Sequence, residues 1–354
     1  LADLVRLMNC YYSNLIEGHV TRPKDIELAL ANAELDEARR PLALEARAHV
    51  LIQRRIDRAF ADQALPVPTT VDFIRTIHGA FYGEMPDDFR FAVGRDGARL
   101  PIRPGAFRMA PEEDVAVGRH VPPSSERVDD FMAHFERRFA RVSTTGVTGI
   151  VAIATAHHRF NFIHPFLDGN GRVSRLMSHA MALRAGIGGG GLWSISRGLA
   201  RGLSERGEYR RMMDHADMPR QGDRDGRGNL SEAALKDFTE WFLKVMLDQL
   251  DFTRTVFEVE AIDGRLRRLL ADLGYGTPAI DLVLTVLRYG EVARGDVPRI
   301  LKAPERTARL ITAKLQASGF LKSSTPKGPL RVAFPIEHRD RLFPRLFGDE
   351  PFAA

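Results

Sequence analysis

The sequence predicts an all-α protein in which a helical bundle, interrupted by one small β-hairpin, is followed by a smaller C-terminal domain. Apolar residues recur at helical spacing along most of the chain, and short extended segments lie among glycines and prolines between about residues 90 and 123. The length of 354 residues exceeds the usual size of one domain. Hydrophobic residues at 44% and charged residues at 27% exclude a fibrous or disordered chain.

Long segments with few helix breakers form the predicted bundle. They are residues 25–64, 125–141, 147–163, 172–185 and 231–258. The extended pieces are residues 100–103 and 115–118, which we interpret as a hairpin or an excursion from the bundle. Glycines follow the last long helical run, so we expect a domain boundary near residues 263–277. The expected domains are residues 1–265 and 275–354.

We expect a cytoplasmic protein without a membrane segment. The apolar stretch at residues 149–156 is far shorter than the roughly 18 residues that a membrane span needs. The chain starts at Leu1 with no signal peptide or basic leader, and the absence of an initial Met suggests missing upstream sequence. The single cysteine, Cys10, excludes an internal disulfide and a zinc site built on cysteines.

The positive charge is concentrated near the C-terminus. The whole chain has a net charge of +5, whereas residues 291–345 carry twelve Lys/Arg against five Asp/Glu, or +7, which leaves −2 for the remainder. Such a local basic excess is expected of a face that binds a polyanion, but charge alone favours a merely solvated face.

The most informative segment is His-Pro-Phe-Leu-Asp-Gly-Asn-Gly-Arg-Val-Ser-Arg at residues 164–175. Its pattern indicates a helix, a tight loop and a second helix. Gly169 and Gly171 permit positive φ and close backbone approach, so successive N–H groups can point into one concavity. The second helix begins near Arg172 and adds the positive end of its dipole there. The segment therefore predicts an anion cradle.

The side chains of the same segment fit nucleotide chemistry. Arg172 and Arg175 are three residues apart, share a helix face and can grip neighbouring phosphates. Asp168 supplies a hard oxygen ligand suited to Mg²⁺, and His164 is a candidate proton acceptor. Each residue alone would fit a surface turn with arginines, but their combination within twelve residues favours a functional site.

This segment resembles the signature of the Fic-domain family, His-Pro-Phe-x-Asp-Gly-Asn-Gly-Arg-x-x-Arg, and every fixed position is present. The resemblance implies a Fic-type helical bundle over about residues 8–255. Members of the family typically use ATP and Mg²⁺ to transfer AMP to a Ser, Thr or Tyr hydroxyl of a protein, and they release pyrophosphate.

The resemblance also implies a role for each signature residue. His164 would deprotonate the target hydroxyl, and Asp168 would hold a Mg²⁺ ion that bridges the α- and β-phosphates. The 169–171 loop, with the Asn170 side chain, would stabilise charge that develops on the α-phosphate. The anchors of the β- and γ-phosphates would be Arg172 and Arg175.

A second pattern, Ser-x-x-x-Glu-Gly, occupies residues 13–18. Ser13 and Glu17 share a helix face, and Gly18 is placed as a C-terminal cap. Alone, the pattern favours a short amphipathic helix with a surface glutamate. Beside the signature it resembles the family's inhibitory motif, on a helix at about residues 8–18. The resemblance pairs Glu17 with Arg175, which would remove the γ-phosphate anchor and repel the triphosphate.

Two further segments resemble parts of the family's nucleotide site. Residues 104–123 resemble a flap hairpin whose edge would align a protein target by backbone pairing, with a possible slip of register at residues 109–114. The flap residues against the nucleotide would be Val117, Gly118, Arg119 and His120. Tyr209 resembles a tyrosine near the base and ribose, and Asp217 is a weaker candidate. Loop and turn residues, and a core tyrosine, are the alternative interpretations.

The C-terminal segment shows the pattern of a winged helix. Helices are expected at residues 278–289, 296–301 and 304–317, followed by strands at 320–322 and 330–334 around a turn. The cations that can contact phosphates are Arg306, Arg309, Lys314, Lys322 and Lys327. Because winged helices also dock proteins, the expected partner is DNA or a protein.

Three functions remain open from the sequence. The leading one is a self-inhibited protein adenylyltransferase that modifies a protein target and itself. The second is a de-AMPylase in which Glu17 assists hydrolysis, and the third is a DNA-binding regulator with a silent or self-modifying Fic core. The family resemblance also allows a homodimer.

Overall fold

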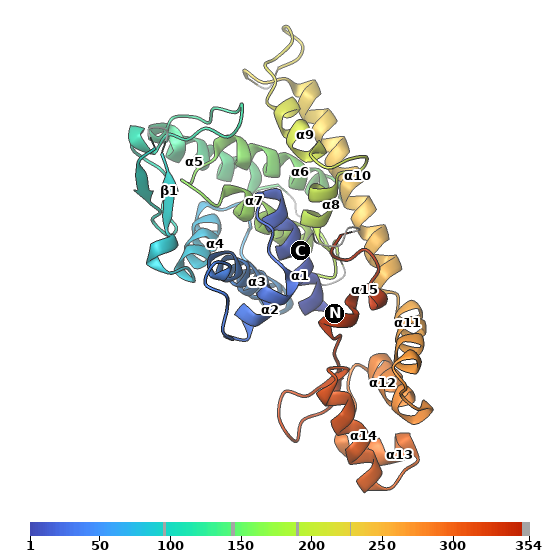
Figure 1. Ribbon diagram of the computed structural model, residues 1–354. Coiled ribbons are helices and arrows are strands. Elements are labelled where there is room, and N and C mark those ends of the chain that lie inside the picture. Colours follow the sequence, from blue (N-terminus) through green and yellow to red (C-terminus); the bar gives the residue numbers. More distant parts are fainter. Residues whose placement is uncertain (95–96, 143–145, 189–190, 227, 349–354) are drawn as a thin grey trace. The chain divides into compact units, whose positions relative to one another are not determined.

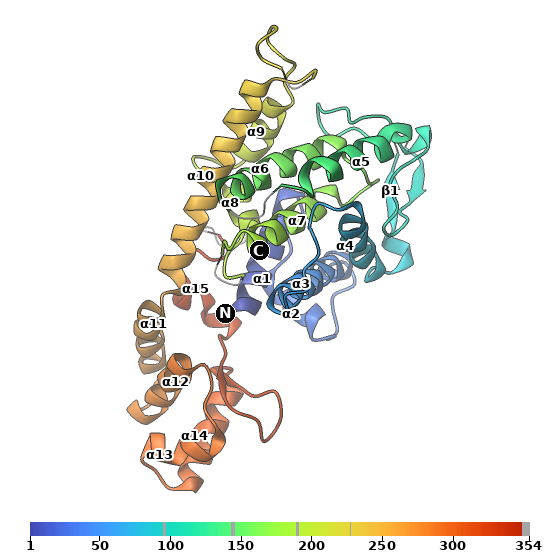
Figure 2. The same cartoon turned by 180° about the vertical axis from the view of Figure 1, so that it is seen from behind.

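The computed structural model describes residues 1–94, 97–142, 146–188, 191–226 and 228–348. The chain divides into two compact units, residues 1–250 and 251–354 (Figures 1 and 2). The described residues are mostly helical and contain two short two-stranded sheets, which agrees with the predicted fold class. No helix among them is long and apolar enough to cross a membrane.

The first unit is a bundle of helices. These are α1 (Ala2–Ile16), α2 (Pro23–Leu30), α3 (Arg40–Ala61), α4 (Val71–Gly83), α5 (Val128–Phe139), α6 (Gly146–Ile163), α7 (Asn170–Arg184), α8 (Ile195–Arg201), α9 (Glu208–Ala216) and most of α10 (Glu232–Phe257). Four predicted helices are therefore present as α5, α6, α7 and α10. Helix α4 shows a typical start, since the Thr70 hydroxyl accepts a hydrogen bond from the Phe73 N–H.

The single helix predicted over residues 25–64 is wrong, because the structure divides it into α2 and α3. Helix α2 ends where Asn32 adopts a positive φ of 52° and the Ala33 N–H donates to the Leu28 carbonyl. Pro41 then lies in the first turn of α3 and disfavours helical backbone before it. The apolar periodicity continues across this break, which is why the sequence pattern did not reveal it.

The β-hairpin lies earlier in the chain than predicted. Strands β1 (Phe91–Val93) and β2 (Arg99–Pro101) pair antiparallel, whereas the expected strand at residues 115–118 is absent. Residues 117–120 instead form a tight turn closed by one bridge between Val117 and His120. Prolines within the 104–123 segment remove ladder donors. The 104–123 segment (called the 104–123 loop below) therefore follows an irregular path.

Buried aromatic and aliphatic side chains of α3 to α7 form the core that holds the signature loop. Phe166, within that loop, is fully buried, and its ring stacks on His78 of α4 with 3.8 Å between ring centroids. Ile163 and Val173, on either side of the loop, belong to the same apolar cluster. Packing of α6 against α7 thus fixes both ends of the loop.

The second unit contains the three helices and two strands predicted for the C-terminal segment, in the predicted order, together with one helix before them and one after them that were not predicted. It contains α11 (Val259–Asp272), α12 (Thr277–Tyr289), α13 (Val297–Leu301), α14 (Glu305–Ala317), β3 (Leu321–Lys322), β4 (Arg331–Val332) and α15 (Arg339–Leu342). Strands β3 and β4 pair antiparallel, and Val292 adds a bridge to Leu330. The unit begins before the boundary expected at 263–277, because α11 packs on α12 and α15. Residues 349–354 of the predicted domain lie outside the described residues.

Candidate active site

Two adjoining cavities bring together most of the predicted site residues, but Ser13, Gly18 and Arg172 line neither of them. The first, of about 480 Å³, lies between the end of α1, the turn at residues 117–120, the signature and α9. The predicted residues that line it are Glu17, Val117, Gly118, Arg119, His120, His164, Gly171, Arg175 and Tyr209. The second, of about 470 Å³, adds Asp168, Gly169 and Asn170 and shares Glu17 and His164 with the first. Glu17 and His164 therefore lie where the two cavities meet.

The signature loop is held by unusual backbone conformations and by one amide. His164 follows α6 with a φ of 50°, and Gly169 has a φ of 80° at the N-cap of α7. The Asn170 side chain accepts a hydrogen bond from the Phe166 N–H at 2.9 Å and donates one to the Phe166 carbonyl at 2.8 Å. The amide is thus committed to the loop backbone, unlike the expected orientation toward an α-phosphate.

Helix α1 supplies a carboxylate to the second signature arginine. The Glu17 Oε1 accepts a hydrogen bond from Arg175 Nη2 at 2.6 Å. Arg175 also donates to the Ser13 hydroxyl at 2.9 Å and to the Ser13 carbonyl at 3.2 Å. The Arg175 side chain is 1% exposed and that of Glu17 31% exposed. Gly18 has a φ of 88° after α1, as the predicted cap requires.

Gly171 allows the close approach between α1 and α7. A Cβ atom added there would lie 2.3 Å from Glu17 Oε1 and 2.9 Å from Arg175 Nη1. Any side chain at position 171 would therefore push the carboxylate away from the arginine. The need for glycine here comes from this contact, since Gly171 lies within α7 and needs no positive φ.

The first signature arginine is also paired, with a residue that the sequence analysis missed. Arg172 forms an ion pair with Glu45 of α3, whose other oxygen lies 3.4 Å from His19 Nδ1. Asp168 lies further away, with 3.9 Å between its Oδ2 and Arg172 Nη1. Glu45 is 127 positions from Arg172 and belongs to no recognisable motif, so only the folded structure reveals the pair.

Replacing Glu45 with glutamine should destabilise the first unit by about 3–5 kcal/mol, because the buried Arg172 then keeps only the more distant carboxylate of Asp168 as an ion-pair partner. Urea unfolding followed by circular dichroism measures this change. The matched control is Glu84→Gln, which breaks the more exposed pairs with Arg47 and Arg55 and should cost less than about 1 kcal/mol. Equal effects of the two substitutions would contradict this interpretation of Glu45.

Asp168 has the properties of a metal ligand whose bound ion would complete its coordination shell with oxygen atoms of the substrate. Its side chain is 54% exposed at the edge of the second cavity, and one oxygen accepts a hydrogen bond from the Tyr82 hydroxyl at 2.6 Å. The described residues contain no cluster of three metal-ligating side chains. Mg²⁺ commonly binds through one or two carboxylates together with substrate phosphates, so this donor set fits it.

His164 is held in its neutral form. Burial lowers the pKa of its imidazole to about 4, with further lowering by the nearby charges of Arg108 and His120. The ring therefore has a free lone pair at neutral pH. A neutral imidazole between two cavities can accept a proton from a hydroxyl group brought to either one.

Three other predicted residues, His120, Tyr209 and Asp217, are tied into hydrogen-bonded networks, whereas Val117, Gly118 and Arg119 are exposed. His120 Nε2 lies 2.8 Å from the Phe162 carbonyl, and its Nδ1 lies 3.0 Å from Asp217. Asp217 also bonds His158 at 2.9 Å. The Tyr209 hydroxyl lies 2.8 Å from His157 Nε2, so Tyr209 is both a core residue and a wall of the first cavity.

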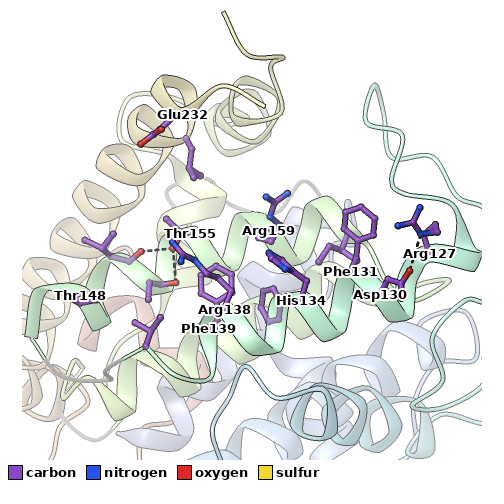
Figure 3. A pocket seen from close by; sticks show the side chains of 16 residues that line it. Arg127, Asp130, Phe131, His134, Arg138, Phe139, Thr148, Thr155, Arg159 and Glu232 are labelled. Carbon is purple, nitrogen blue, oxygen red and sulfur yellow. Dashed lines mark hydrogen bonds and ion pairs between the residues drawn. The ribbon is translucent and has the colours of Figure 1, made fainter. Parts of the chain in front are cut away.

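A larger cavity of about 950 Å³ lies on another face of the first unit, between α5, α6 and the start of α10 (Figure 3). Arg138, Arg159 and Glu232 lie along it with aromatic side chains of α5. None of the predicted site residues lines it. Its size therefore does not mark it as the site of the chemistry.

Residues 68–182 match the model of the Fic/DOC family. The "Protein adenylyltransferase Fic" of Drosophila ananassae is 40% identical over 86 residues, and that of Drosophila melanogaster is 38% identical over 86 residues. Each match covers 24% of this chain and 17% of the fly protein, so the chain spans about a sixth of the length of these relatives.

One solved structure, a Fic family protein from Desulfovibrio desulfuricans G20, aligns with 95% of this chain and 88% of its own, at 17% identity and a TM-score of 0.49. The match to the Fic/DOC family model includes the whole signature at residues 164–175. Over residues 68–182, about a third of its length, this chain is therefore similar to the Fic/DOC family.

Proposed function

We propose that the protein is a self-inhibited protein adenylyltransferase, which transfers AMP from ATP to a Ser, Thr or Tyr hydroxyl of a protein target and of itself. The ion pair between Glu17 and Arg175 carries this proposal, because it joins a glutamate on α1 to a signature arginine beside His164. The name of the fly relatives supports the same reaction class.

The first cavity is the proposed nucleotide site, and the second receives the target. Tyr209 and the turn at residues 117–120 would enclose the base and ribose in the first cavity. The second cavity is lined by Val93 and by residues 114–117, so a target segment there can pair with backbone beside His164. This arrangement holds the two substrates on opposite sides of the imidazole.

His164 is the proposed general base. As the target oxygen attacks the α-phosphorus, its proton passes to the neutral imidazole. The bond from the α-phosphorus to the bridging oxygen breaks, and the electron pair leaves with pyrophosphate. The negative charge of the bound triphosphate raises the pKa of a neighbouring imidazole, which makes it a better base in the complex than in the free protein.

The signature helix would hold the triphosphate. Arg172 and Arg175 lie in the first turns of α7, where the helix dipole also favours negative charge. Mg²⁺ held by Asp168 would neutralise phosphate charge and orient the leaving group. Holding the triphosphate in one orientation is the main contribution expected of such a site, because phosphoryl chemistry depends on positioning and electrostatics.

Glu17 would inhibit the reaction by occupying Arg175. While the carboxylate accepts the Arg175 hydrogen bond, the γ-phosphate has no partner there and meets a negative charge instead. ATP then binds weakly or in an unproductive orientation. Because Glu17 and Arg175 belong to one chain, inhibition is independent of protein concentration.

This inhibition should not vary between about pH 6 and 9. Burial raises the pKa of Glu17, but the charges of Arg175 and Arg172 outweigh it and lower the pKa to about 2. A carboxyl whose pKa is lowered keeps its ion pair above its ordinary pKa and loses it only as the pH falls toward 2. The ratio of AMP transfer by Glu17→Gly to transfer by wild type, measured across this range, should stay constant. A ratio that drops tenfold toward pH 6 would contradict this assignment.

The reaction class is tested with the Glu17→Gly variant and ATP labelled at either the α- or the γ-phosphorus. We expect the α-label, and not the γ-label, to become attached to the protein and to targets in a cell lysate. Transfer of the γ-label would instead indicate a kinase-type reaction. If neither label is transferred although ATP binds, adenylyl transfer is excluded for this chain under those conditions.

Removal of AMP from a modified protein is a second candidate. Glu17 lines both cavities beside His164, where its carboxylate can activate a water molecule. Incubation of an AMP-modified target with wild type and with Glu17→Gln separates the two reactions. Release of AMP that requires Glu17 would support removal, whereas transfer that increases without Glu17 supports the leading proposal.

The C-terminal unit is the proposed partner-binding module, of the winged-helix type. Exposed cations on α14 and on the β3–β4 turn suit contacts with DNA phosphates, namely Arg306, Arg309, Lys314, Lys322 and Lys327. Retention on DNA that weakens with salt and disappears on deletion of residues 270–354 would support DNA binding. Salt-independent capture of a protein would favour docking instead.

A further inference from the structure

Arg108 is a buried arginine that neither cavity contains. Its side chain has no exposed surface, and its guanidinium donates to the carbonyls of Ile163 at 3.1 Å and His164 at 2.8 Å. It also donates to the Pro123 carbonyl at 2.5 Å and to the Ser125 hydroxyl at 2.9 Å. One side chain thus connects the end of α6 with the far end of the 104–123 loop.

These contacts lie at the C-terminal end of α6, where the backbone leaves the helical conformation. His164 has a left-handed φ of 50°, a conformation that is unfavourable for a residue with a side chain. Its carbonyl points away from the helix ladder and is satisfied by Arg108 Nε. The Arg108 N–H donates to the Pro165 carbonyl at 2.9 Å, so the side chain and the backbone of Arg108 together bind three successive carbonyls, at residues 163–165.

We infer that Arg108 is a positioning residue for His164: its guanidinium fixes the left-handed backbone that aims the imidazole at the junction of the two cavities, and it links that backbone to the 104–123 loop. For its kinetic readout this inference rests on the proposed adenylyl transfer. Arg108 lines neither cavity, so it acts through His164 and does not bind nucleotide.

Because Arg108 is positively charged, the inference can also be tested through the pKa of the His164 imidazole. The guanidinium contributes, after burial, to the lowered pKa of the His164 imidazole. The other charged or titratable groups that face His164 or line its cavities are Glu17, Asp114, Arg119, His120, Asp168, Arg175, Tyr209, Arg210, Asp214 and Asp217, of which Asp114 also forms an ion pair with Arg108. Arg108 lies outside the cavities, so its influence persists when the cavities fill with substrate.

The test uses the full chain carrying Glu17→Gly, so that activity is measurable, with Arg108→Gln or Arg108→Lys added. Arg108→Gln should lower kcat by about 100-fold, the effect expected when a reacting group is misplaced by about 1 Å. ATP affinity, measured by calorimetry, should change less than about twofold because Arg108 does not contact the nucleotide site. Arg108→Lys keeps the charge but cannot reproduce the fork of donors, so it should recover only part of the loss.

The pH profile separates positioning from a general loss of structure. A protonated imidazole cannot act as base, so activity falls as the pH drops through the pKa of His164. Without the Arg108 charge this acid limb should move to higher pH in Arg108→Gln and stay in place in Arg108→Lys. Arg103→Gln is the matched control, because Arg103 directly precedes the 104–123 loop and donates to Glu113 of that loop at 2.6 Å without touching His164.

A milder variant covers the case in which Arg108→Gln does not fold. Ser125→Ala removes the hydroxyl that accepts from Arg108 and donates to Asp114, and it leaves the guanidinium in place. It should lower kcat several-fold with ATP affinity unchanged. A kcat equal to that of the Glu17→Gly parent in Arg108→Gln, or in Ser125→Ala when the former is unfolded, would overturn the inference, as would a parallel loss of ATP binding.

Failure of the inference is distinguishable from failure of the proposed function. The imidazole pKa of His164 can be followed by NMR in protein with labelled histidine, with His164→Ala identifying the signal. A rise in that pKa in Arg108→Gln, compared with Arg103→Gln, would support the inference even if no adenylyl transfer is found. An unchanged pKa together with unchanged chemical shifts of His164 would overturn it.

Discussion

Replacing Glu17 with glycine should tighten ATP binding by about 10- to 100-fold and raise AMP transfer at least as much. One charge-assisted hydrogen bond to Arg175 is removed from the resting state, and such bonds contribute about 1.5–3 kcal/mol. The γ-phosphate can then occupy the position of the carboxylate. Calorimetry with ATP and rates of self-modification measure the two effects.

The choice of ligand makes this prediction specific. AMP lacks the β- and γ-phosphates, so its affinity should change less than about twofold between wild type and Glu17→Gly. Glu17→Gln is the matched control, since it keeps the size of the side chain and removes its charge; it should give most of the increase for ATP. An equal gain for ATP and AMP would show that Glu17 blocks the whole cavity instead of the γ-phosphate position.

Replacing His164 with alanine in the Glu17→Gly protein should lower AMP transfer by about 10²- to 10⁴-fold, the usual contribution of a general base. His164 lies where the two cavities meet, and the substitution alters no residue of α7. ATP affinity should therefore stay within about threefold of the parent. Single-turnover transfer with α-labelled ATP, together with calorimetry, separates the chemical step from binding.

His157→Gln supplies a comparison for this result. His157 lies on the same helix, is fully buried and bonds Ser178 and Tyr209, so its loss perturbs packing near the site without removing the base. It should reduce transfer much less than His164→Ala, with any loss following protein stability. Similar losses in both variants would indicate that His164 also acts through packing.

Much of the site could be predicted because its parts are contiguous in the sequence. The segment at residues 164–175 encodes a helix end, a glycine loop and a helix start within twelve positions, and the structure forms them there. The cap after α1 was also predictable, because Gly18 alone can adopt its positive φ without strain. The order of helices and strands in the second unit followed from periodicity and turn residues.

What the sequence did not reveal depends on tertiary contacts. The partner of Arg172 is Glu45, whose position on α3 matters only once α3 packs beside α7. From the sequence alone, the Asn170 amide could equally well bind an anion or the backbone of its own loop. Only the folded loop shows that it is hydrogen-bonded to Phe166. The hairpin was misplaced because β1 and β2 have three residues each, too few for alternation to identify them.

The most direct test of the account compares three proteins for transfer of label from α-labelled ATP with Mg²⁺: wild type, Glu17→Gly, and Glu17→Gly with His164→Ala. The account predicts weak labelling of wild type, strong labelling of Glu17→Gly and almost none of the double variant. Equal labelling of wild type and Glu17→Gly would contradict inhibition by α1. Undiminished labelling of the double variant would contradict His164 as the base, and with it the proposed chemistry of the site.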